Sequence, residues 1–573
     1  MKISIDWLKE LVDLNCSIEE LIKLLPLKTI GLKEVTAQYI ELDMKGYNRA
    51  DLLSLRGVAY EVSAITNSRV YFGEPHSAEF VWNQKNLPQI PVTVKDNKFC
   101  TLYCLTKIEK VKVNKSSAEV IRKLEESGMR SVNNIADITN LVMLEYGHPL
   151  HAFDAKKVEN EEIIVRFAKN GEEIITLDGK KRKLSSSDLL ITDPKKAVGI
   201  AGVMGGENSE VTNQTETILL EAAIFDPVSI RKTTTSLGLP SEAAKRFQHG
   251  LSKKRLLQAL DAAIKMYQVL GGRLVAINIV GKHEDQTKKI NLTKDKLDAL
   301  VGISFNKKQV EDYLKGLGFK LASQGSTLRG WEVEVPYSRL DINIEEDVIE
   351  EVARMYGYEK IPPSRVLEIE PLQKEDVIFK EIADFKKKLV ELGLTEVQTY
   401  SFYSTDVLDA LGFTQEYKKF LVKIANPISS ETEYLRMNLW PNLVEVVGRN
   451  IRRGYNDIGI FEVGKSYHQL FDGKGEPQEV YALSIALYNG TDNPIEELLS
   501  LVKEMGLNIK LNSAPVSSVV TNLFHPKRFV HLEKEGKEIG GMGEVHLRVL
   551  NKLGIEKRIA VLEIELESNR HPN

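Results

Sequence analysis

The side chains of this sequence that are best suited to chemistry lie between positions 139 and 247. Groups that can take up or release a proton occur there inside otherwise apolar segments, namely His148, His151, Asp154, Glu221 and Glu242. Glycines that permit tight turns stand beside them at positions 199, 202, 205 and 206. Apolar walls with a few convergent polar groups are typical of a concave ligand pocket. The stretch therefore predicts a pocket, and these residues alone do not identify its ligand.

A second group of reactive side chains follows in the stretch YSRLDINIEEDVIEEVARMYGY. Asp347, Glu350 and Glu351 stand at i, i+3 and i+4 of an expected helix, hence on one face, and Asp341 lies just before it. Four converging carboxylates would repel one another without a cation, such as Mg2+, or a set of basic partners. Alternatively, acidic side chains simply favour a helix N-terminus and face water. On the pattern alone we favour this second interpretation.

The bulk composition limits what these residues can belong to. A chain of 573 residues is too long for one core and divides into several domains. With 42% hydrophobic and 28% charged residues it has the composition of an ordinary soluble protein, and it contains no apolar run of 18 residues. The net charge of −4 excludes a strongly basic nucleic-acid binder, although it leaves room for local basic patches.

The compartment can be inferred from the cysteines and from the N-terminus. Three cysteines, Cys16, Cys100 and Cys104, are a sparse and odd set, which fits a reducing compartment. We interpret Cys100 and Cys104 as core residues rather than metal ligands. The N-terminal stretch contains acidic residues and has the pattern of neither a signal peptide nor a transit peptide, so we expect a cytoplasmic protein.

The elements that must position these side chains indicate an α+β protein with four regions. Residues 1–95 open with a helix. A turn and cap at 48–51 then precede a second helix, which carries the apolar stripe Leu52, Leu55, Val58 and Val62. Residues 81–95 resemble a connector. Region 96–283 contains the predicted pocket, with a strand at 101–113 and helices at 116–129 and 252–272. Region 288–361 is a small unit of helix, helix and strand that precedes the acidic helix.

The fourth region, 376–573, begins with a helix and continues with strand-like stretches of period two, which favours an antiparallel sheet. The expected strands lie at 396–403, 420–429, 458–468, 481–488, 528–534 and 559–567. Polar or proline-containing linkers are expected at 283–289 and 362–375. The sequence contains no Walker A loop, HExxH or GxSxG motif.

Eight segments in a fixed order carry a resemblance to a known family. They are NRADLLSLRGVAYEV, NNIADITNLVMLEYGHPLHAFD, GIAGVMGGENSEV, LLEAAIFDPVSIRKT, SEAAKRFQHG, YSRLDINIEEDVIEEVARMYGY, NPISSETEYLRMNLWPNL and NIRRGYNDIGIFEVG. Together they run over almost the whole chain. On these segments the chain resembles the β (heavy) subunit of bacterial-type phenylalanyl-tRNA synthetase.

The resemblance implies that the predicted pocket is an editing site, which hydrolyses tRNA-Phe wrongly charged with tyrosine. Such a site is needed because an apolar site shaped for phenylalanine rejects an added hydroxyl by no more than about a hundredfold. By the family pattern Glu221 binds the tyrosine hydroxyl, and His151 is the local base or water-orienting group. The tRNA's terminal hydroxyl can share that work, so no catalytic triad is assigned. The remaining positions of the family pattern are Thr139, Asn140 and Pro149, which line the pocket, and Gly202 and Ala243, where bulk would block it.

The resemblance also implies a metal, partners and domain types. Asp341, Asp347, Glu350 and Glu351 would bind Mg2+ shared with the α subunit, within a winged-helix-type module. Region 376–573 resembles a degenerate class II synthetase-like domain, because Arg436 is followed by Met-Asn and GGMGEVHLR is at best a remnant of the glycine-rich motif. We therefore expect ATP and phenylalanine to be activated on the α subunit, in an (αβ)2 heterotetramer that binds tRNA-Phe and no membrane.

Two departures from the family pattern concern tRNA binding. The sequence leaves no room for an OB-fold insertion near the N-terminus, and it stops before a ferredoxin-like anticodon-binding domain. Three basic clusters, each of which is either a phosphate contact or a solvated face, remain at 180–183, 253–255 and 449–453. Two alternatives to an editing subunit therefore stay open, namely a scaffold that does not edit and a free-standing deacylase.

Overall fold

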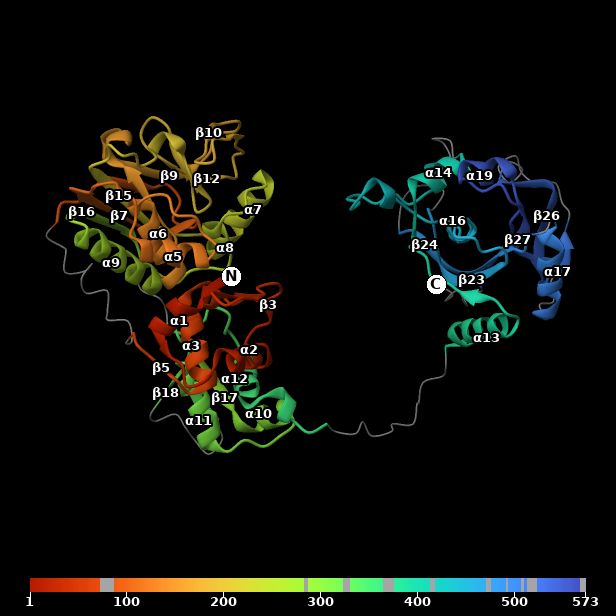
Figure 1. The fold of residues 1–573 in the computed structure, drawn as a ribbon, viewed down its shortest axis with the longest axis horizontal. Helices are drawn as coiled ribbons and strands as arrows, with labels where there is room; N and C mark the ends of the chain where they lie inside the picture. The colour runs from red at the N-terminus through yellow and green to blue at the C-terminus, as the bar shows by residue number, and fades with distance from the viewer. Residues whose placement is uncertain are drawn as a thin grey trace. The chain divides into compact units, whose positions relative to one another are not determined.

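The computed structural model consists of two compact units, Met1–Arg365 and Val366–Asn573, which we describe one at a time (Figure 1). The structure describes residues 1–72, 87–282, 287–322, 330–363, 376–412, 418–469, 476–490, 493–506, 510–512 and 523–566. Most of the expected linkers at 283–289 and 362–375, and the first part of the connector at 81–95, lie outside these described residues. No helix among the described residues is long and apolar enough to cross a membrane.

The N-terminal part of the first unit packs three helices against a small sheet. The helices are α1 (Ile5–Leu11), α2 (Ile18–Lys28) and α3 (Leu55–Thr66), and the sheet has the strand order β1 (Lys2–Ser4), β4 (Tyr39–Leu42), β3 (Leu32–Val35). The short strands β2 (Val12–Asp13) and β5 (Arg69–Val70) pair separately. The predicted apolar stripe is confirmed, because Leu55, Val58 and Val62 are buried on α3. The predicted cap is wrong: Ser54 caps α3, and Asp51 lies in a preceding 3-10 turn.

The central part of the first unit contains two sheets that share one apolar core. The first sheet has the order β16 (Arg273–Gly281), β7 (Cys100–Glu109), β15 (Thr217–Phe225), β8 (Leu150–Asp154). The second has the order β14 (Met204–Gly205), β13 (Ala197–Ile200), β12 (Leu189–Thr192), β9 (Ile163–Phe167), β6 (Val92–Val94). Successive side chains of a strand point to opposite faces, so each strand of the first sheet contributes to two cores. Leu219 and Ala223 enter the core between the sheets, whereas Leu220 and Ala222 enter a second core.

Helices form the second core on the outer face of the first sheet (Figure 1). They are α6 (Asn134–Tyr146) and α9 (Lys253–Val269), and α5 (Ala118–Glu126) packs beside α6. Two further helices, α7 (Pro227–Leu237) and α8 (Glu242–Gln248), follow β15, and the hairpin of β10 (Glu173–Ile175) and β11 (Lys181–Lys183) projects from the second sheet. Cys100 and Cys104 are buried in the inner and outer core, respectively, which confirms their interpretation as core residues.

The last part of the first unit is a small sheet covered by helices. Its strands have the order β17 (Lys289–Thr293), β19 (Gly330–Glu334), β18 (Lys320–Leu321). The helices are α10 (Lys294–Val301), α11 (Lys307–Gly316) and the predicted acidic helix α12 (Glu345–Tyr356). Leu297, Val310, Trp331 and Val348 form their common core, against which Ile65 of α3 also packs.

The second unit is built on a seven-stranded sheet with an apolar core on each face. The strand order is β20 (Thr395–Glu396), β23 (Ile458–His468), β24 (Gln478–Tyr488), β28 (Ala560–Glu565), β27 (Lys537–Val545), β26 (Phe524–Lys534), β25 (Lys510–Asn512). All neighbours are antiparallel except β20 and β23. The helices that cover it are α13 (Val377–Glu391), α14 (Thr405–Leu411), α16 (Trp440–Arg452), α17 (Pro494–Glu504) and α19 (Leu547–Lys552).

The strand expected at 420–429 is wrong, since this segment contributes one isolated bridge, between Lys423 and Tyr434. Pro427 offers no backbone donor to a ladder, and the segment is largely exposed. The expected strand 396–403 is reduced to Glu396 of β20 and the short β21 (Phe402–Tyr403), which pairs with β22 (Tyr434–Leu435). The glycine-rich strand β27 was not expected.

Helix α9 offers a direct test of the outer core. Leu260 is completely buried against the sheet, whereas Val269 on the same helix is 86% exposed. We expect Leu260→Ala to lower the free energy of unfolding by about 2–5 kcal/mol, because it leaves a cavity. Val269→Ala changes it by less than about 0.5 kcal/mol. Urea unfolding of both variants measures this, and equal losses would contradict the packing of α9.

Candidate functional site

Two predicted site residues, Glu221 and His151, meet in the layer between the two sheets. Glu221 on β15 lies directly opposite His151 on the antiparallel neighbour β8. Residues in this position have Cβ atoms about 5 Å apart and point to the same face. The face is the inner one, because Leu219 and Phe153, two positions away on each strand, belong to the core between the sheets. The fold thus brings together a carboxyl and an imidazole that are 70 residues apart in sequence.

Gly205 makes room for the His151 ring. A Cβ at this position of β14 would lie 2.5 Å from Cε1 and 2.6 Å from Nε2 of His151, which a real side chain could not tolerate. The ring also contacts Phe153 edge-on, with the ring centroids 4.5 Å apart. Its Nε2 is buried and has no hydrogen-bond partner among the described residues. A nitrogen of this kind remains available to a water molecule or a ligand.

Burial moves the pKa values of the two groups in opposite directions. Burial raises the pKa of Glu221 to about 7, and a hydrogen bond from the Tyr103 hydroxyl to Oε2, at 3.0 Å, opposes this rise. Burial lowers the pKa of His151 to about 4. At neutral pH His151 is therefore unprotonated, while Glu221 exists in both protonation states. A pair whose pKa values are pushed apart is typical of groups that take different roles in catalysis or binding.

A second part of the predicted set surrounds Phe247 on α8. Gly202 adopts a φ of +65°, and a Cβ there would come within 3.0–3.1 Å of Ile230, Phe247 and Phe225. Ala243 on α8 packs against the same core. His148 is fully buried, and its ring lies 6.1 Å from that of Phe247. Burial and the nearby Arg255 lower the pKa of His148 to about 3, so this ring is neutral.

The remaining predicted residues have local structural contacts. Thr139 donates its hydroxyl to the Ala136 carbonyl at 2.7 Å within α6, on which Asn140 also lies. Pro149 is buried in the link between α6 and β8. Asp154 accepts from the Thr215 hydroxyl at 2.7 Å, and Glu242 pairs with Arg246 and Lys245. Asp154 and Glu242 therefore already have polar partners within the chain.

Tyr103 is the member of the site that the sequence did not indicate. It lies on β7, is fully buried, and reaches Glu221 across 118 positions of sequence. No motif marks a tyrosine inside an apolar strand. A signal would have come only from the strand register, which pairs Tyr103 with Ala223 and so makes it a diagonal neighbour of Glu221.

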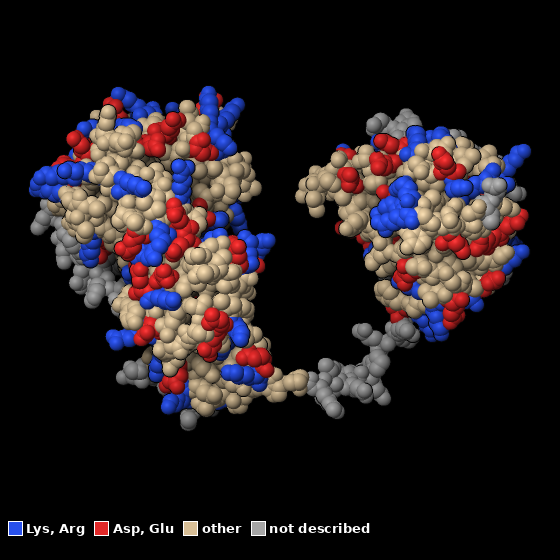
Figure 2. Space-filling view, in the orientation of Figure 1, with Lys and Arg blue, Asp and Glu red and all other residues tan. Residues whose placement is uncertain are grey.

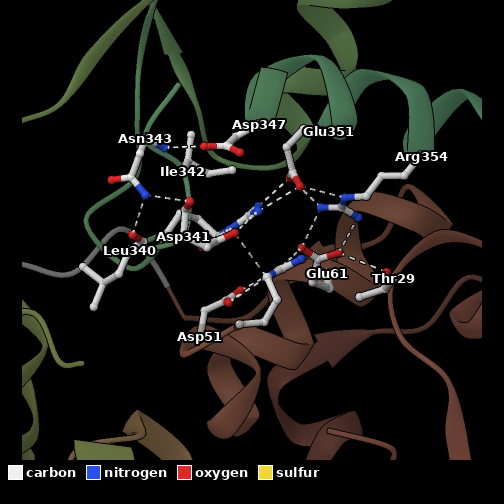
Figure 3. Close-up of polar contacts among 12 residues, drawn as sticks. Thr29, Asp51, Glu61, Leu340, Asp341, Ile342, Asn343, Asp347, Glu351 and Arg354 are labelled. Carbon is white, nitrogen blue, oxygen red and sulfur yellow. Dashed lines mark hydrogen bonds and ion pairs between the residues drawn. The ribbon is translucent and has the colours of Figure 1, made fainter. Parts of the chain in front are cut away.

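The acidic cluster adopts a different arrangement from a metal site (Figure 3). Glu351 accepts from Arg339 at 2.5 and 2.8 Å and from Arg354 at 2.6 and 2.9 Å. Arg339 also pairs with Asp341 at 2.7 Å. Asp347 caps the helix, accepting from the backbone N–H groups of residues 343 and 344 at 2.7 and 3.0 Å, and Glu350 is exposed.

Three of the four expected metal ligands, Asp341, Asp347 and Glu351, are engaged in these contacts, and the binding of Mg2+ by the set stays a prediction. Among the described residues, no group of three or more His, Cys, Asp and Glu side chains is placed to hold a metal. The reason is that Arg339 and Arg354 supply the positive charge that the carboxylates need. The set of basic partners, which the sequence left open beside a cation, is the arrangement found. The described carboxylates of this chain alone therefore do not form a magnesium site.

The ion pairs of Arg354 extend to residues in the N-terminal part of the chain. Arg354 donates to both oxygens of Glu61 at 2.9 Å, and Glu61 accepts from Arg49 at 2.6 Å. Arg49 in turn pairs with Asp51 at 2.7 Å. We call this set the buried ion network; its members are Arg49, Asp51, Glu61, Arg339, Asp341, Glu351 and Arg354. Burial alone would raise the pKa of Glu61, but Arg354 and Arg49 hold it well below the usual value.

In the second unit, Arg436 is buried and donates to Glu462 at 2.7 Å and to Thr399 at 2.9 Å.

The expected basic cluster at 180–183, in the first unit, is partly neutralised: Lys181 pairs with Glu173 and Arg182 with Asp178. On the face seen in Figure 2, each unit carries basic and acidic side chains intermixed.

Comparison with known proteins places the chain among synthetase subunits. Family models match at residues 99–272 (B3/4 domain), 290–358 (tRNA synthetase B5 domain) and 363–566 (phenylalanyl tRNA synthetase beta chain CLM domain).

Three curated relatives are beta subunits of phenylalanine–tRNA ligase. The protein from Carboxydothermus hydrogenoformans is 34% identical over 93% of this chain and 67% of its own length. That from Staphylococcus haemolyticus is 33% identical over 94% and 68%, and that from Syntrophus aciditrophicus 33% over 91% and 66%. The chain thus spans about two thirds of the length of these relatives.

The buried ion network predicts a large and pH-dependent effect of one substitution. Glu61→Gln breaks the pairs with both Arg49 and Arg354, and we expect it to lower the free energy of unfolding by about 3–5 kcal/mol. Glu479→Gln, which breaks an exposed pair with Lys465, costs at most about 1 kcal/mol. Denaturant unfolding of the two variants at neutral pH measures the difference. Equal effects would contradict a stabilising network.

The pH dependence follows from the sign of the shift. Because the pKa of Glu61 is depressed in the folded chain, its contribution is complete above the ordinary value of about 4.3 and is lost as the pH falls toward the folded value. We therefore expect the wild type and Glu61→Gln to converge in stability as the pH is lowered below about 4. A difference that stays constant with pH would show that lost packing, rather than lost charge, causes the effect.

Proposed function

The chain belongs to the family of phenylalanine–tRNA ligase beta subunits, and from this premise we propose that it hydrolyses tRNA-Phe wrongly charged with tyrosine at the site between its two sheets. The observation that carries the proposal is the buried pair of Glu221 and His151, with Tyr103 bound to the carboxyl group. Aminoacylation itself belongs, in this proposal, to an α subunit.

Glu221 is suited to select a tyrosyl group. A carboxyl with a pKa of about 7 is partly ionised at neutral pH and can accept a hydrogen bond from a phenol hydroxyl. The Tyr103 hydroxyl already makes this kind of bond. A phenylalanyl group lacks the hydroxyl and would leave the buried carboxylate without that partner. Sites that hydrogen-bond a substrate hydroxyl reject the analogue without it strongly, which is the selectivity that editing requires.

His151 is suited to the hydrolytic step. Its imidazole is neutral above pH 4, and its buried Nε2 has no hydrogen-bond partner within the described part of the chain, so it can take a proton from water or orient it. The water oxygen would attack the ester carbonyl carbon, and the bond to the terminal ribose oxygen of the tRNA would break as that oxygen gains a proton. Free tyrosine and uncharged tRNA-Phe are the products.

The other positions would shape the site. Gly202 and Ala243 keep the region around Phe247 small, and a Cβ at Gly202 would contact three side chains of that region. We propose that Thr139, Asn140 and Pro149 contribute to binding from α6 and the link that follows it. The helix and the link precede β8, which carries His151.

Assembly with an α subunit and with tRNA-Phe is part of the proposal, and we propose the (αβ)2 stoichiometry of the family. A Mg2+ ion shared with that subunit would need oxygen ligands from outside this chain, because Arg339 neutralises Asp341 and Glu351. Asp347 and Glu350 are the carboxylates left for it, and no step of the proposed hydrolysis passes through the ion.

The site is tested by deacylation of Tyr-tRNA-Phe with the chain assembled with an α subunit. We expect His151→Ala to slow hydrolysis by roughly 100-fold, the size of a general-base effect. Glu221→Ala loses the preference for Tyr-tRNA-Phe over Phe-tRNA-Phe. Glu216→Gln, which alters an exposed carboxylate just before β15, serves as the matched control and hydrolyses normally.

The outcomes distinguish the alternatives. Hydrolysis no faster than without the chain, combined with normal charging of tRNA-Phe, would contradict editing and leave a scaffold subunit. Full hydrolysis by the chain without any α subunit would favour a free-standing deacylase.

The pKa of Glu221 gives a second test. If the ionised carboxylate accepts the phenol hydroxyl, Tyr-specific hydrolysis rises with pH through about 7 and then levels off. Glu221→Gln removes this rise, since an amide does not titrate. A pH profile that is identical in wild type and Glu221→Gln would contradict the assigned role.

A further inference from the structure

Tyr103 is held in a position where it can control Glu221. Its side chain is fully buried in the layer between the sheets, and its hydroxyl donates to Oε2 of Glu221 at 3.0 Å. The register of β7 and β15 pairs Tyr103 with Ala223, so the phenol crosses diagonally to reach the carboxyl two positions away. Tyr103 on β7 and Glu221 on β15 therefore extend from neighbouring strands of the same sheet.

We propose that Tyr103 is a positioning and specificity-determining residue: its phenol fixes the Glu221 carboxyl through Oε2, so that Oε1 is presented to the hydroxyl of a tyrosyl group. This inference rests on the proposed editing function. In this arrangement the Glu221 carboxyl group would accept hydrogen bonds from two phenols at the same time, one from Tyr103 and one from the tyrosyl group of the substrate.

The hydrogen bond matters because a carboxyl group alone is poorly oriented. The last torsion of a glutamate side chain is broad, so its two oxygens exchange positions easily. Glu221 is only 7% exposed, and within the described residues Oε2 is the oxygen that has a hydrogen-bond partner. A donor fixed to one oxygen defines the plane of the group and leaves the other oxygen for a ligand.

Tyr103 also favours the ionised form of the carboxyl group. A hydrogen bond donated to a carboxylate stabilises the charged form, and here it opposes the effect of burial on the pKa of Glu221. Burial and Glu221 raise the pKa of Tyr103 itself well above its usual value, so the phenol stays a donor at any physiological pH.

The other titratable groups close to Glu221 and Tyr103 are uncharged near neutral pH. His151 has its pKa lowered to about 4 by burial, and burial raises the pKa of the Cys100 and Cys104 thiols. Burial therefore has the largest effect on the protonation of Glu221, and the hydrogen bond from the Tyr103 phenol is the interaction that opposes it.

The substitution Tyr103→Phe tests the inference, because it removes one hydroxyl and keeps the ring. We expect the KM for deacylation of Tyr-tRNA-Phe by the assembled enzyme to rise roughly 10-fold, with a smaller change in kcat, as for the loss of one hydrogen bond to a charged group. The rise of activity with pH should also move to higher pH, since burial is no longer opposed.

Tyr267→Phe is the matched control. Tyr267 is equally buried and donates one hydrogen bond, to the Ile135 carbonyl at 2.9 Å, in the outer core. We expect both variants to lose similar thermal stability, whereas only Tyr103→Phe changes KM and the pH profile. A Tyr103→Phe variant with the kinetics of Tyr267→Phe would overturn the proposal, because the role of Tyr103 would then be only structural.

A second substitution keeps the test decisive if Tyr103→Phe folds poorly. Replacing Tyr103 by 3-fluorotyrosine retains the hydroxyl and makes it a stronger donor, so the rise of activity should move to lower pH. An unchanged profile would contradict the proposal. Glu221→Ala, measured in parallel, separates the two levels of inference. If it keeps the preference for Tyr-tRNA-Phe over Phe-tRNA-Phe, the proposed function itself fails. If it loses that preference while Tyr103→Phe is unaffected, only the role of Tyr103 is overturned.

Discussion

The buried ion network is the interaction on which the first unit depends. Its three guanidinium groups and four carboxylates join residues about 300 positions apart, from α3 and the turn before it to α12. Burying charges costs several kcal/mol for each ion unless every group is paired and hydrogen-bonded. Here Arg354 contacts both oxygens of Glu61 and of Glu351. These contacts neutralise the charges and also fix the relative positions of the side chains.

The turn that carries this network also supports the candidate site. The carbonyl of Leu53 accepts from Arg246 of α8 at 3.1 Å, and that of Ala50 accepts from Arg255 of α9 at 3.2 Å. A Cβ at Gly147, which ends α6, would lie 2.8 Å from Ser54, so the link that leads to β8 is closely packed there. The helices that flank the site are thus tied to the network through one short segment. Through these contacts, a charge cluster that is not part of the site helps to determine its shape.

Within the candidate site, the proposed function depends on the burial of Glu221 and His151. The inner layer between the sheets is apolar, and this raises the pKa of Glu221 and lowers that of His151. At neutral pH His151 is therefore uncharged and Glu221 is only partly ionised, because burial favours the uncharged form of each group. Among the described residues, the Tyr103 hydrogen bond is the contact that lowers the pKa of Glu221. The balance between burial and this bond sets the ionised fraction of Glu221, which in the proposed function accepts a hydrogen bond from the substrate hydroxyl.

Local patterns in the sequence predicted several helices, including α5 and α9, whose observed ends lie within a few residues of the expected ones. They also predicted that Glu221 and His151 belong to one apolar stretch. They could not supply long-range partners: Tyr103 carries no signal, and the pairing of Glu61 with Arg354 is visible only in the fold. The acidic helix shows the same limit, because Arg339 stands two residues from Asp341 in the sequence, yet spacing alone did not decide between a metal and an arginine.

The central claim is that Glu221 reads the hydroxyl of a tyrosyl group while Tyr103 holds it. The most direct measurement is a crystal structure of the assembled enzyme with a non-hydrolysable analogue of the 3′-tyrosyl adenosine end. Our account predicts the tyrosyl oxygen within hydrogen-bond distance of Glu221 Oε1, with the Tyr103 hydroxyl still on Oε2. An analogue bound away from Glu221, or one that displaces Tyr103 from the carboxyl group, would contradict it.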